Sequence, residues 1–565
     1  MYITAVPNRG SNPTILLRES FREDGKVKNK TLANLSKLPP EAVDAVKRVL
    51  SGETLVPASE AFEIVRTVKH GHADVALKAI RKLGLDRMIS SRKCKERDLV
   101  LSMLAMRLFG PGSKLKTARN LITTSLPREL GLGDDVSEDD LYRAMDWVFE
   151  RQGAIEKKLA NKHLKSGGLV LYDLTSTWVE GEQCPLAKRG YSRDGKQDKL
   201  QVNFGLVTDD DGRPISVSVY AGNTADPATV QDQVRKLKEE FGIERVVFVG
   251  DRGMVTQTRI DSFIEQGDID WISALKSVSL RKLRTEGVLQ LGLFDETNLF
   301  EFKSEHYPKD RLVACRNEEL MKRRANKRQS LIAATKKELE KIKNTVRSGR
   351  LRGKDNIGVR VGRVINKHKV AKHFKLNISD QKLGYRVRTD SVEAEAALDG
   401  IYVIRTSVSA EAMSAEDTVR NYKRLAHVEK SFRAMKTIDL KVRPIYHYAE
   451  NRVRAHIFLC MLAYYVEWHL RHVWKSLLFA NEVDTLFTRD PVKPAKPTAQ
   501  GRRKARTKKT EDGFTVHSFG SLLDHLSTIA ISTCRRPGAP EGETWDMPTQ
   551  PDALQRRAFQ LLGEL

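Results

Sequence analysis

Cysteine is scarce in this chain, with 5 among 565 residues, and the five are far apart in the sequence. No two of them form a Cys-x-x-Cys pair, and none lies in a cluster with histidine. This spacing argues against a zinc site and against a disulfide framework. We therefore expect a chain that folds in a reducing compartment.

Long hydrophobic runs are also lacking where a targeting or membrane segment would be found. Residues 1–20 contain no apolar core of the signal-peptide type. The most apolar run, residues 455–470, has polar ends and is shorter than the roughly 20 apolar residues that a bilayer crossing requires. We predict a buried core helix there, no membrane contact and a cytoplasmic protein.

Acidic residues are too few to balance the basic ones. The chain has 98 Lys and Arg against 73 Asp and Glu, which leaves a formal net charge of +25. Such a surplus favours a polyanionic partner, because each Lys or Arg beside a phosphate releases condensed counterions. Simple solubility is the competing explanation, and nucleic acid is the prediction that we adopt.

The N-terminal part of the chain changes from extended to helical patterning. Residues 1–56 alternate short extended segments with turns, and Thr14–Lys30 has the pattern of a hairpin that turns at Asp24-Gly25. From 57 to 165 the spacing is helical, with one amphipathic helix ending at Gly110. The basic residues of this helical region either contact DNA or face solvent, and both interpretations stay open.

From residue 168 the pattern is that of an α/β domain. Apolar strands are expected at 169–172, 200–208, 214–220, 246–249 and 270–275, with helices at 229–241 and 256–266. An Asp-Asp-Asp-Gly turn at residues 209–212 joins the second and third strands. Three antiparallel strands, a helix, a strand, a helix and a strand predict a mixed five-stranded sheet with flanking helices.

This regular pattern is interrupted at residues 280–398. The interruption holds strand-like pieces and one long basic helix at about residues 317–346, which suits either a solvated coiled-coil arm or a DNA contact. Strand character returns at 400–406, and helices are expected at 415–435 and 450–480. A linker rich in Pro, Lys and Arg follows, and its composition predicts disorder.

Two aspartates follow apolar strands of the predicted sheet. Asp173 ends the strand 169–172, and Asp251 comes one glycine after the strand 246–249. Strand ends open on a crevice where ligands bind. A single aspartate there is usually a helix cap or a turn residue, but two from one sheet can clamp a hard divalent cation through oxygen.

Glu429 is the candidate for a third carboxylate, in the middle of a basic helix. Tyr422, Glu429 and Lys436 are seven residues apart, and seven residues leave only about 20° of drift around a helix. The three side chains are therefore predicted on one face, which Arg433 joins four residues after Glu429. Ordinary surface charges are the alternative, whereas this grouping suits a metal ion and a phosphate.

Several segments resemble motifs of the bacterial insertion-sequence DDE transposases, in the superfamily typified by insertion sequence four. GLVLYDLTSTWVEG resembles their first-aspartate motif, and VVFVGDRGM, with Arg252 after Asp251, resembles the second. The hairpin segment between them and the later RPIYH are also similar. The helix around Glu429 resembles the Tyr-Arg-Glu-Lys signature, usually Y-x2-R-x3-E-x6-K. Here Arg424 comes one place early, and Leu425 holds the usual position.

The resemblance implies a ribonuclease-H-like core with a large insertion between the second aspartate and the glutamate. Asp173, Asp251 and Glu429 would hold two Mg²⁺ ions, which Mn²⁺ could replace. The residues implied for positioning phosphates or DNA are Tyr422, Arg424, Arg433, Lys436 and Arg252.

The implied function is that of a DNA transposase, which binds terminal inverted repeats, cuts the DNA ends and joins them to target DNA by two-metal phosphoryl transfer. The implied partners are inverted-repeat DNA, target DNA and a second copy of the chain, since relatives act as dimers. Two alternatives stay open: a ribonuclease-H-like nuclease without strand transfer, and a catalytically silent, transposase-derived DNA-binding protein.

Six regions follow from these patterns. They are an N-terminal extended segment (1–56), a helical, DNA-binding domain (57–165), the first part of the catalytic core (166–279), an insertion domain with the basic helix (280–398), the second part of the core with the Glu-bearing helix (399–480), and a basic linker with a C-terminal tail (481–565).

Overall fold

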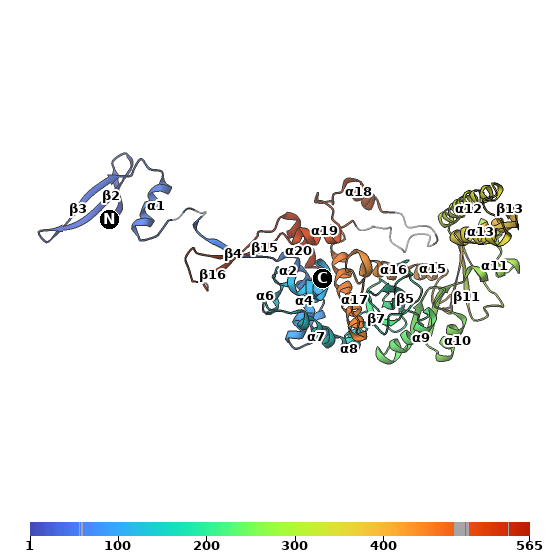
Figure 1. The fold of residues 1–565 in the computed structure, drawn as a ribbon. Coiled ribbons are helices and arrows are strands. Elements are labelled where there is room, and N and C mark those ends of the chain that lie inside the picture. The colour runs from blue at the N-terminus through green and yellow to red at the C-terminus, as the bar shows by residue number, and fades with distance from the viewer. Residues whose placement is uncertain (56, 58–59, 480–491, 493–496, 541) are drawn as a thin grey trace. The chain divides into compact units, whose positions relative to one another are not determined.

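A computed structural model describes residues 1–55, 57, 60–479, 492, 497–540 and 542–565. The chain divides into two compact units (Figure 1). The smaller unit comprises residues 1–68 and 530–550, and the larger comprises residues 69–529 and 551–565. The six expected regions are distributed over these two units.

The described residues of the smaller unit form two three-stranded sheets and a helix. Strands β1 (Tyr2–Asn8), β2 (Ser11–Glu23) and β3 (Lys26–Asn34) make the first sheet in that order. The second sheet has the order β16-β15-β4, with β4 at Glu63–Lys69, β15 at Ala530–Arg535 and β16 at Thr544–Pro548.

The hairpin between β2 and β3 confirms the sequence prediction. It turns at Asp24 and Gly25, which have φ angles of 49° and 74°. Helix α1 (Pro40–Leu50) corrects the expectation that residues 1–56 are extended throughout. A proline at the first helical position, Glu41 in the first turn and Lys47 in the last turn all favour that helix.

Helices fill residues 71–163 of the larger unit. They are α2 (Gly71–Lys82), α3 (Leu85–Ile89), α4 (Lys95–Phe109), α5 (Lys114–Leu121), α6 (Leu126–Leu130), α7 (Glu138–Phe149) and α8 (Gln152–His163). The predicted end of α4 at Gly110 is confirmed. Its predicted amphipathic character is wrong, because α2, α7 and α17 pack around it and bury it from Asp98 to Leu108.

The described strands between residues 169 and 406 form an eight-stranded mixed sheet and one separate hairpin. The sheet order is β10-β11-β14-β9-β8-β5-β6-β7. Its members are β5 (Leu169–Trp178), β6 (Gln201–Thr208), β7 (Pro214–Ala221), β8 (Val246–Val249), β9 (Ile269–Ala274), β10 (Leu299–Phe302), β11 (Arg311–Arg316) and β14 (Ile401–Thr406).

The five strands expected from the sequence are β9-β8-β5-β6-β7. In this part β5, β6 and β7 are antiparallel, while β8 runs parallel to both β5 and β9. The sequence predicted five strands for this sheet, fewer than the eight that the structure has. Strand β14 pairs with the outer edge of β9, and β11 and β10 continue from it. Two strands of the expected insertion therefore belong to the main sheet.

Helices connect these strands. They are α9 (Asp226–Arg235), which continues as a π-helix to Glu240, α10 (Gln257–Gln266), α11 (Ser277–Thr285) and α14 (Thr389–Ala396). Short 3₁₀ helices cover Leu291–Asp295 and Ala371–His373.

The rest of the insertion has an apolar core of its own. The long basic helix is α12 (Glu318–Arg347), and it packs on α13 (Lys354–His368) and on the hairpin of β12 (Phe374–Ser379) and β13 (Lys382–Val387). Leu339, Ile342, Ile357 and Val361 are buried between them. The helix thus combines a packed apolar side with exposed basic residues. In Figure 1, α12, α13 and β13 are drawn above α11 and β11.

Helix α17 (Glu450–Val473) joins the helical part to the sheet, since it packs on α4, α7 and β7. It is buried from Ala455 to Glu467, as expected for a helix that is apolar on all sides. Within the described ranges, none of the helices combines the length and apolarity that crossing a bilayer requires.

The C-terminal region contains α18 (Ala499–Thr507), α19 (Phe519–Leu526) and α20 (Ala553–Leu562). Disorder was expected for the basic linker, and α18 corrects this for residues 499–507. Thr498 caps that helix by accepting a hydrogen bond from the Gly501 amide. Residues 480–491 and 493–496 of the predicted linker lie outside the described residues.

Candidate active site

Asp173 and Asp251 occupy matching places on adjacent parallel strands. Leu171 of β5 pairs with Val249 of β8, so each aspartate lies two residues beyond the same paired position. Asp173 does not end its strand as predicted, because β5 continues to Trp178 in its pairing with β6. The end of β8 opens the sheet beside Asp173, and Asp251 follows at that opening.

The electrostatic surroundings of Asp173 include two further carboxylates. The pKa of Asp173 is raised to about 7, chiefly by burial and also by the negative charges of Asp251 and Glu429, while the Leu174 amide and Arg193 oppose the shift. That amide donates to Asp173 Oδ1 at 2.8 Å. The charges of Asp251 and Glu429 therefore both act on Asp173.

The predicted helix at 415–435 is present but divided. Helix α15 (Ala415–Lys423) ends at Arg424, α16 (Leu425–Arg433) follows, and a π-helix covers Ala434–Ile438. Helix α16 packs on β5 and buries Val428 and Phe432, while the Glu429 side chain is exposed.

Tyr422 lies where the spacing placed it, close to the carboxylates. Its hydroxyl donates to Asp251 Oδ1 at 3.5 Å. Burial raises the pKa of Tyr422, and the charges of Asp251 and Glu429 raise it further. The phenol therefore stays protonated and remains a donor to the carboxylate.

Lys436 does not share the exposed face of Glu429. The π-helix changes the rotation per residue after Arg433, and the Lys436 side chain is buried. Its ammonium donates to Thr175 Oγ1 at 2.9 Å and pairs with Asp194 at 2.7 Å. Burial lowers the pKa of Lys436, an effect that Asp194 opposes.

Asp194 and Arg443 complete this buried group and were missed in the sequence. Arg443 Nη1 lies 2.5 Å from Asp194 Oδ2, and its guanidinium lies 4.8 Å from the Trp178 ring centroid. A bridge between Val179 and Ile445 brings the two segments together. The RPIYH motif contained Arg443, but no spacing connected it to Asp194.

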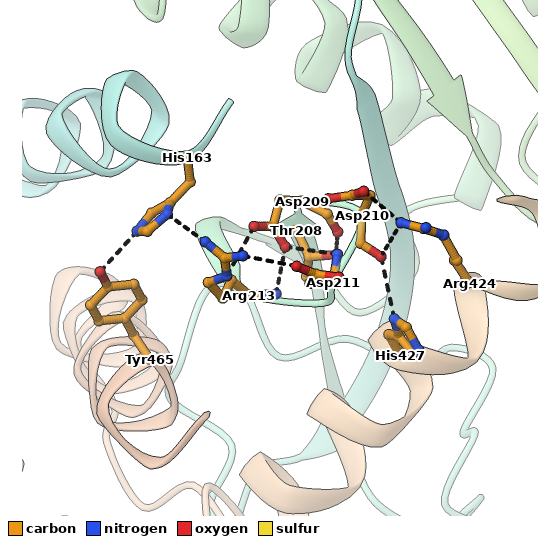
Figure 2. A network of polar contacts seen from close by, with 9 residues as sticks. All are labelled: His163, Thr208, Asp209, Asp210, Asp211, Arg213, Arg424, His427 and Tyr465. Atoms are coloured by element: carbon orange, nitrogen blue, oxygen red, sulfur yellow. Dashed lines mark hydrogen bonds and ion pairs between the residues drawn. The ribbon is translucent and has the colours of Figure 1, made fainter. Parts of the chain in front are cut away.

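Arg424 contacts the β6–β7 hairpin instead of the carboxylates (Figure 2). Its Nη1 donates to the Asp210 carboxylate at 2.5 Å and to the Asp210 carbonyl at 3.2 Å. His427 contacts that carbonyl through Nδ1 at 3.3 Å. A Cβ on Gly212 would lie 2.6 Å from His427 Cβ, so the close approach of hairpin and helix needs glycine there.

The other side of this hairpin is joined to two helices. Arg213 contacts His163 of α8 at 2.9 Å and pairs with Asp209 and Asp211 at 3.2 and 2.9 Å (Figure 2). His163 in turn contacts the Tyr465 hydroxyl of α17 at 2.9 Å. The hairpin therefore holds α16 in place relative to α8 and α17, and Arg424 acts as its anchor.

Arg433 and Arg252 are both exposed. Arg433 follows Glu429 by one helical turn, as expected. Arg252 lines a cavity of about 630 Å³ whose other walls come from α11, α12, α14, the segment 367–373 and residues 398–399. The basic residues of that cavity are Arg252, Arg281, Arg324, Lys327, Arg328, Lys367, Lys369 and Lys372. Two acidic residues also line it: Asp399 pairs with Arg328, and Glu395 pairs with Arg328 and Lys372.

Asp173, Asp251 and Glu429 are the metal ligands that the sequence predicts. Among the residues that the structure describes, no three His, Cys, Asp or Glu side chains form a group that could hold a metal ion as they stand. What relates the three carboxylates is the charge of Asp251 and Glu429 acting on Asp173. Their charges fit a divalent cation, because a positive charge between them would remove the repulsion that raises the pKa of Asp173.

Comparison with known families decides the identity of the chain. The sequence pattern of the transposase DDE domain matches residues 166–466, and that of the N-terminal domain of IS1634 family transposases matches residues 3–57. The chain belongs to the DDE transposases. It is therefore a DNA transposase of an insertion sequence, and the family expected from the sequence motifs is confirmed. No curated protein matches the chain.

Two solved transposase structures show a distant likeness. A piggyBac transposase synaptic complex with hairpin DNA is 8% identical, with 81% of this chain and 70% of that chain covered and a TM-score of 0.33. A Mos1 transposase paired-end complex with the left transposon end is 14% identical, with 44% and 71% covered and a TM-score of 0.15. Since both scores are low, we transfer no residue role from either.

Proposed function

We propose that Asp173, Asp251 and Glu429 are the catalytic carboxylates of this transposase. The single observation behind this assignment is their common place: two aspartates in register on β5 and β8, with the charge of Glu429 acting on the first. The strand order β7-β6-β5-β8-β9, with its antiparallel and parallel parts, supports a ribonuclease-H-like core, to which the transposase adds β14, β11 and β10.

The chemistry that we propose is phosphoryl transfer on DNA. Two Mg²⁺ ions held by Asp173, Asp251 and Glu429 would supply activation of the attacking oxygen and stabilisation of the leaving oxygen, and Mn²⁺ would substitute. The three carboxylates supply the negative charge for such ions. Tyr422 orients Asp251 by its hydrogen bond, and exposed Arg433 is available to a phosphate beside Glu429.

Lys436 and Arg424 have supporting roles in this proposal. Lys436 holds Thr175, two residues after Asp173, and so fixes the strand that carries the first carboxylate. Arg424 holds the hairpin that positions the Glu429 helix. Both are positioning residues, since neither contacts Asp173, Asp251 or Glu429. The basic cavity at Arg252 offers a further surface for the phosphate backbone.

The proposed substrates are the terminal inverted repeats of the element and a target DNA, to which the cut ends are joined. The net charge of +25 suits two DNA partners. We further propose that a homodimer brings two ends together and that the transposase acts on nucleoid DNA in the bacterial cytoplasm.

Asp251→Asn tests the carboxylate assignment, because it removes one charge at an exposed position and keeps the side-chain size. Mg²⁺-dependent cleavage of an inverted-repeat duplex should fall by at least about 10³-fold, since metal stabilisation is worth several kcal/mol. Binding of the duplex should persist. Asp261→Asn, a carboxylate exposed on α10, is the matched control. If Asp251→Asn still cleaves the duplex at the unchanged rate, Asp251 is not a catalytic carboxylate.

A second assay separates joining from cutting. A pre-cut inverted-repeat end with a free 3′-hydroxyl is incubated with a plasmid target and Mg²⁺. Covalent joining is expected for the unchanged chain and not for Asp251→Asn. Cleavage without joining would instead indicate a nuclease that has lost strand transfer.

A further inference from the structure

A second charged site lies in the same unit, where the helical part meets the segment after the Glu429 helix. It is a cavity of about 210 Å³ with walls from α4, α5, α7, α17 and residues 441–447. The side chains with basic groups in its wall are Arg107, Lys114, Lys441, Arg443, His447 and His456. No Asp or Glu is among the described residues that line it. We call it the cation pocket.

Lys114 is the most deeply buried lysine or arginine of the cation pocket, and it lacks an acidic partner among the described residues. The residue is only 4% exposed, and Arg107 beside it is 7% exposed. Within the described part of the chain, no acidic group pairs with the Lys114 ammonium. Its pKa is lowered to about 7, chiefly by burial and also by the positive charge of Arg107. Two buried like charges without an anion are costly to keep.

His456, which also lines the cation pocket, has one ring nitrogen without a described partner. Its Nε2 contacts the Val442 carbonyl at 3.0 Å, whereas its buried Nδ1 has no hydrogen-bond partner among the described atoms. The His447 ring lies 5.1 Å away between centroids. Burial lowers the pKa of both rings, and the charges of Arg107 and Lys114 contribute. An anion would reverse this effect and supply Nδ1 with a partner.

The N-terminus of α5 opens into the same cavity. Ser113 caps the helix by accepting from the Lys116 amide, and Gly112 and Ser113 line the wall. The first amides of a helix have no partner inside the helix and attract negative charge. The helix terminus, the buried Lys114 and the unpaired Nδ1 of His456 therefore converge on one space.

We propose that the cation pocket binds a phosphate group, either of the DNA backbone or of free phosphate. Arg107 and Lys114 have no carboxylate partner among the described residues, whereas Arg443 is paired with Asp194. An unpaired guanidinium and ammonium suit a small polyvalent anion, and together with helix amides they are donors from which a phosphate accepts hydrogen bonds. Exposed Tyr446 and Lys441 at its wall leave a route from solvent. This site does not depend on the assignment of the catalytic carboxylates.

The first test measures thermal unfolding of the full chain in inorganic phosphate and in chloride at equal ionic strength. Phosphate should raise the Tm of the unchanged chain by about 1–3 °C when it is well above its Kd. Lys114→Met should raise the Tm in chloride, because it removes an unpaired buried charge, and should abolish the phosphate-dependent rise. Lys116→Met, exposed on the same helix, should keep that rise.

Two outcomes would overturn the proposal: a Tm of Lys114→Met in chloride below that of the unchanged chain, or an equal phosphate-dependent rise in both. His447→Gln gives an independent check, since it removes a partly exposed imidazole that an anion in the pocket would allow to take up a proton, and it should weaken the phosphate effect. None of these measurements requires cleavage, so their failure is distinct from failure of the proposed active site.

The second test identifies the source of the phosphate. Affinity for an inverted-repeat duplex is measured over a range of salt concentrations. If the DNA backbone occupies the pocket, Lys114→Met should weaken binding and reduce the salt slope by about 0.9, the value for one phosphate contact. If free phosphate occupies it, DNA binding stays unchanged while the thermal effect of phosphate is lost in Lys114→Met.

Discussion

The three carboxylates that we propose as catalytic and the cation pocket carry unpaired side chains of opposite charge. Asp173, Asp251 and Glu429 form no ion pair with a Lys or Arg among the described residues, and the cation pocket has no acidic side chain in its described wall. The buried Glu467, by contrast, is paired, since it accepts from Arg471 at 2.6 Å. The unpaired carboxylates suit a cation, and the cation pocket suits an anion.

A row of paired charges connects these two places. Lys436 contacts Thr175 of β5 and Asp194, and Asp194 pairs with Arg443, which lines the cation pocket. Paired charges of this kind hold segments in place, whereas unpaired ones attract ligands. The contrast gives four ways to test which charges act directly and which act by position.

The largest effect is expected from Glu429→Gln, which removes an unpaired carboxylate. Mg²⁺-dependent DNA cleavage should fall by about 10³-fold, because the ligand charge for the metal is lost. Glu416→Gln is the matched control, since Glu416 is an exposed glutamate in the first turn of α15. Equal rates for the two variants would place Glu429 among ordinary surface charges.

Asp173→Asn should change the pH dependence of stability in the absence of metal. The pKa of Asp173 is raised from 3.8 to about 7, so the folded chain binds a proton between these values that the unfolded chain does not. Stability therefore falls as pH rises through this window. The variant lacks this fall and should be more stable than the unchanged chain at pH 8, by on the order of a few kcal/mol.

Denaturant unfolding at pH 5 and pH 8 checks this prediction. The advantage of Asp173→Asn should be larger at pH 8, and added Mg²⁺ should stabilise the unchanged chain more than the variant. An advantage that does not depend on pH would show that the shift of this carboxyl is absent.

Lys436→Met should have a smaller effect, because Lys436 acts through Thr175 and Asp194. Cleavage is expected to fall by about ten- to a hundredfold, and the Tm should fall as Asp194 loses one of its two partners. The Mg²⁺ concentration for half-maximal rate should rise if β5 shifts. Lys430→Met, exposed on α16, should change none of these quantities. A lower Tm with an unchanged Mg²⁺ requirement would make Lys436 a purely structural residue.

The smallest effect is expected at the anchor between Arg424 and Asp210. This pair is partly exposed, with side-chain exposures of 15% and 47%. A double-mutant cycle with Arg424→Ala and Asp210→Ala should give a coupling of about 0.5–1 kcal/mol in stability. The cleavage rate should fall only a fewfold in each variant. A loss as large as that of Glu429→Gln would assign Arg424 a direct role.

Local patterns in the sequence were sufficient for much of this molecule. Alternation and apolar runs predicted the strands β5 to β9, because burial imposes those patterns on each strand separately. The uniformly apolar run at 455–470 predicted the buried helix α17. The strand-following positions of Asp173 and Asp251 predicted that they meet, since parallel neighbours bring equivalent positions together.

Tertiary structure decided what depends on contacts between distant segments. The seven-residue spacing placed Tyr422 correctly, but a π-helix with no sequence signal turned Lys436 inward to Asp194. Arg424 was drawn to Asp210, and β10 and β11 joined the main sheet, because long-range pairing and not local preference determines such partners. The cation pocket was also invisible in the sequence, since its six basic residues come from positions 107 to 456 and share a wall only after folding.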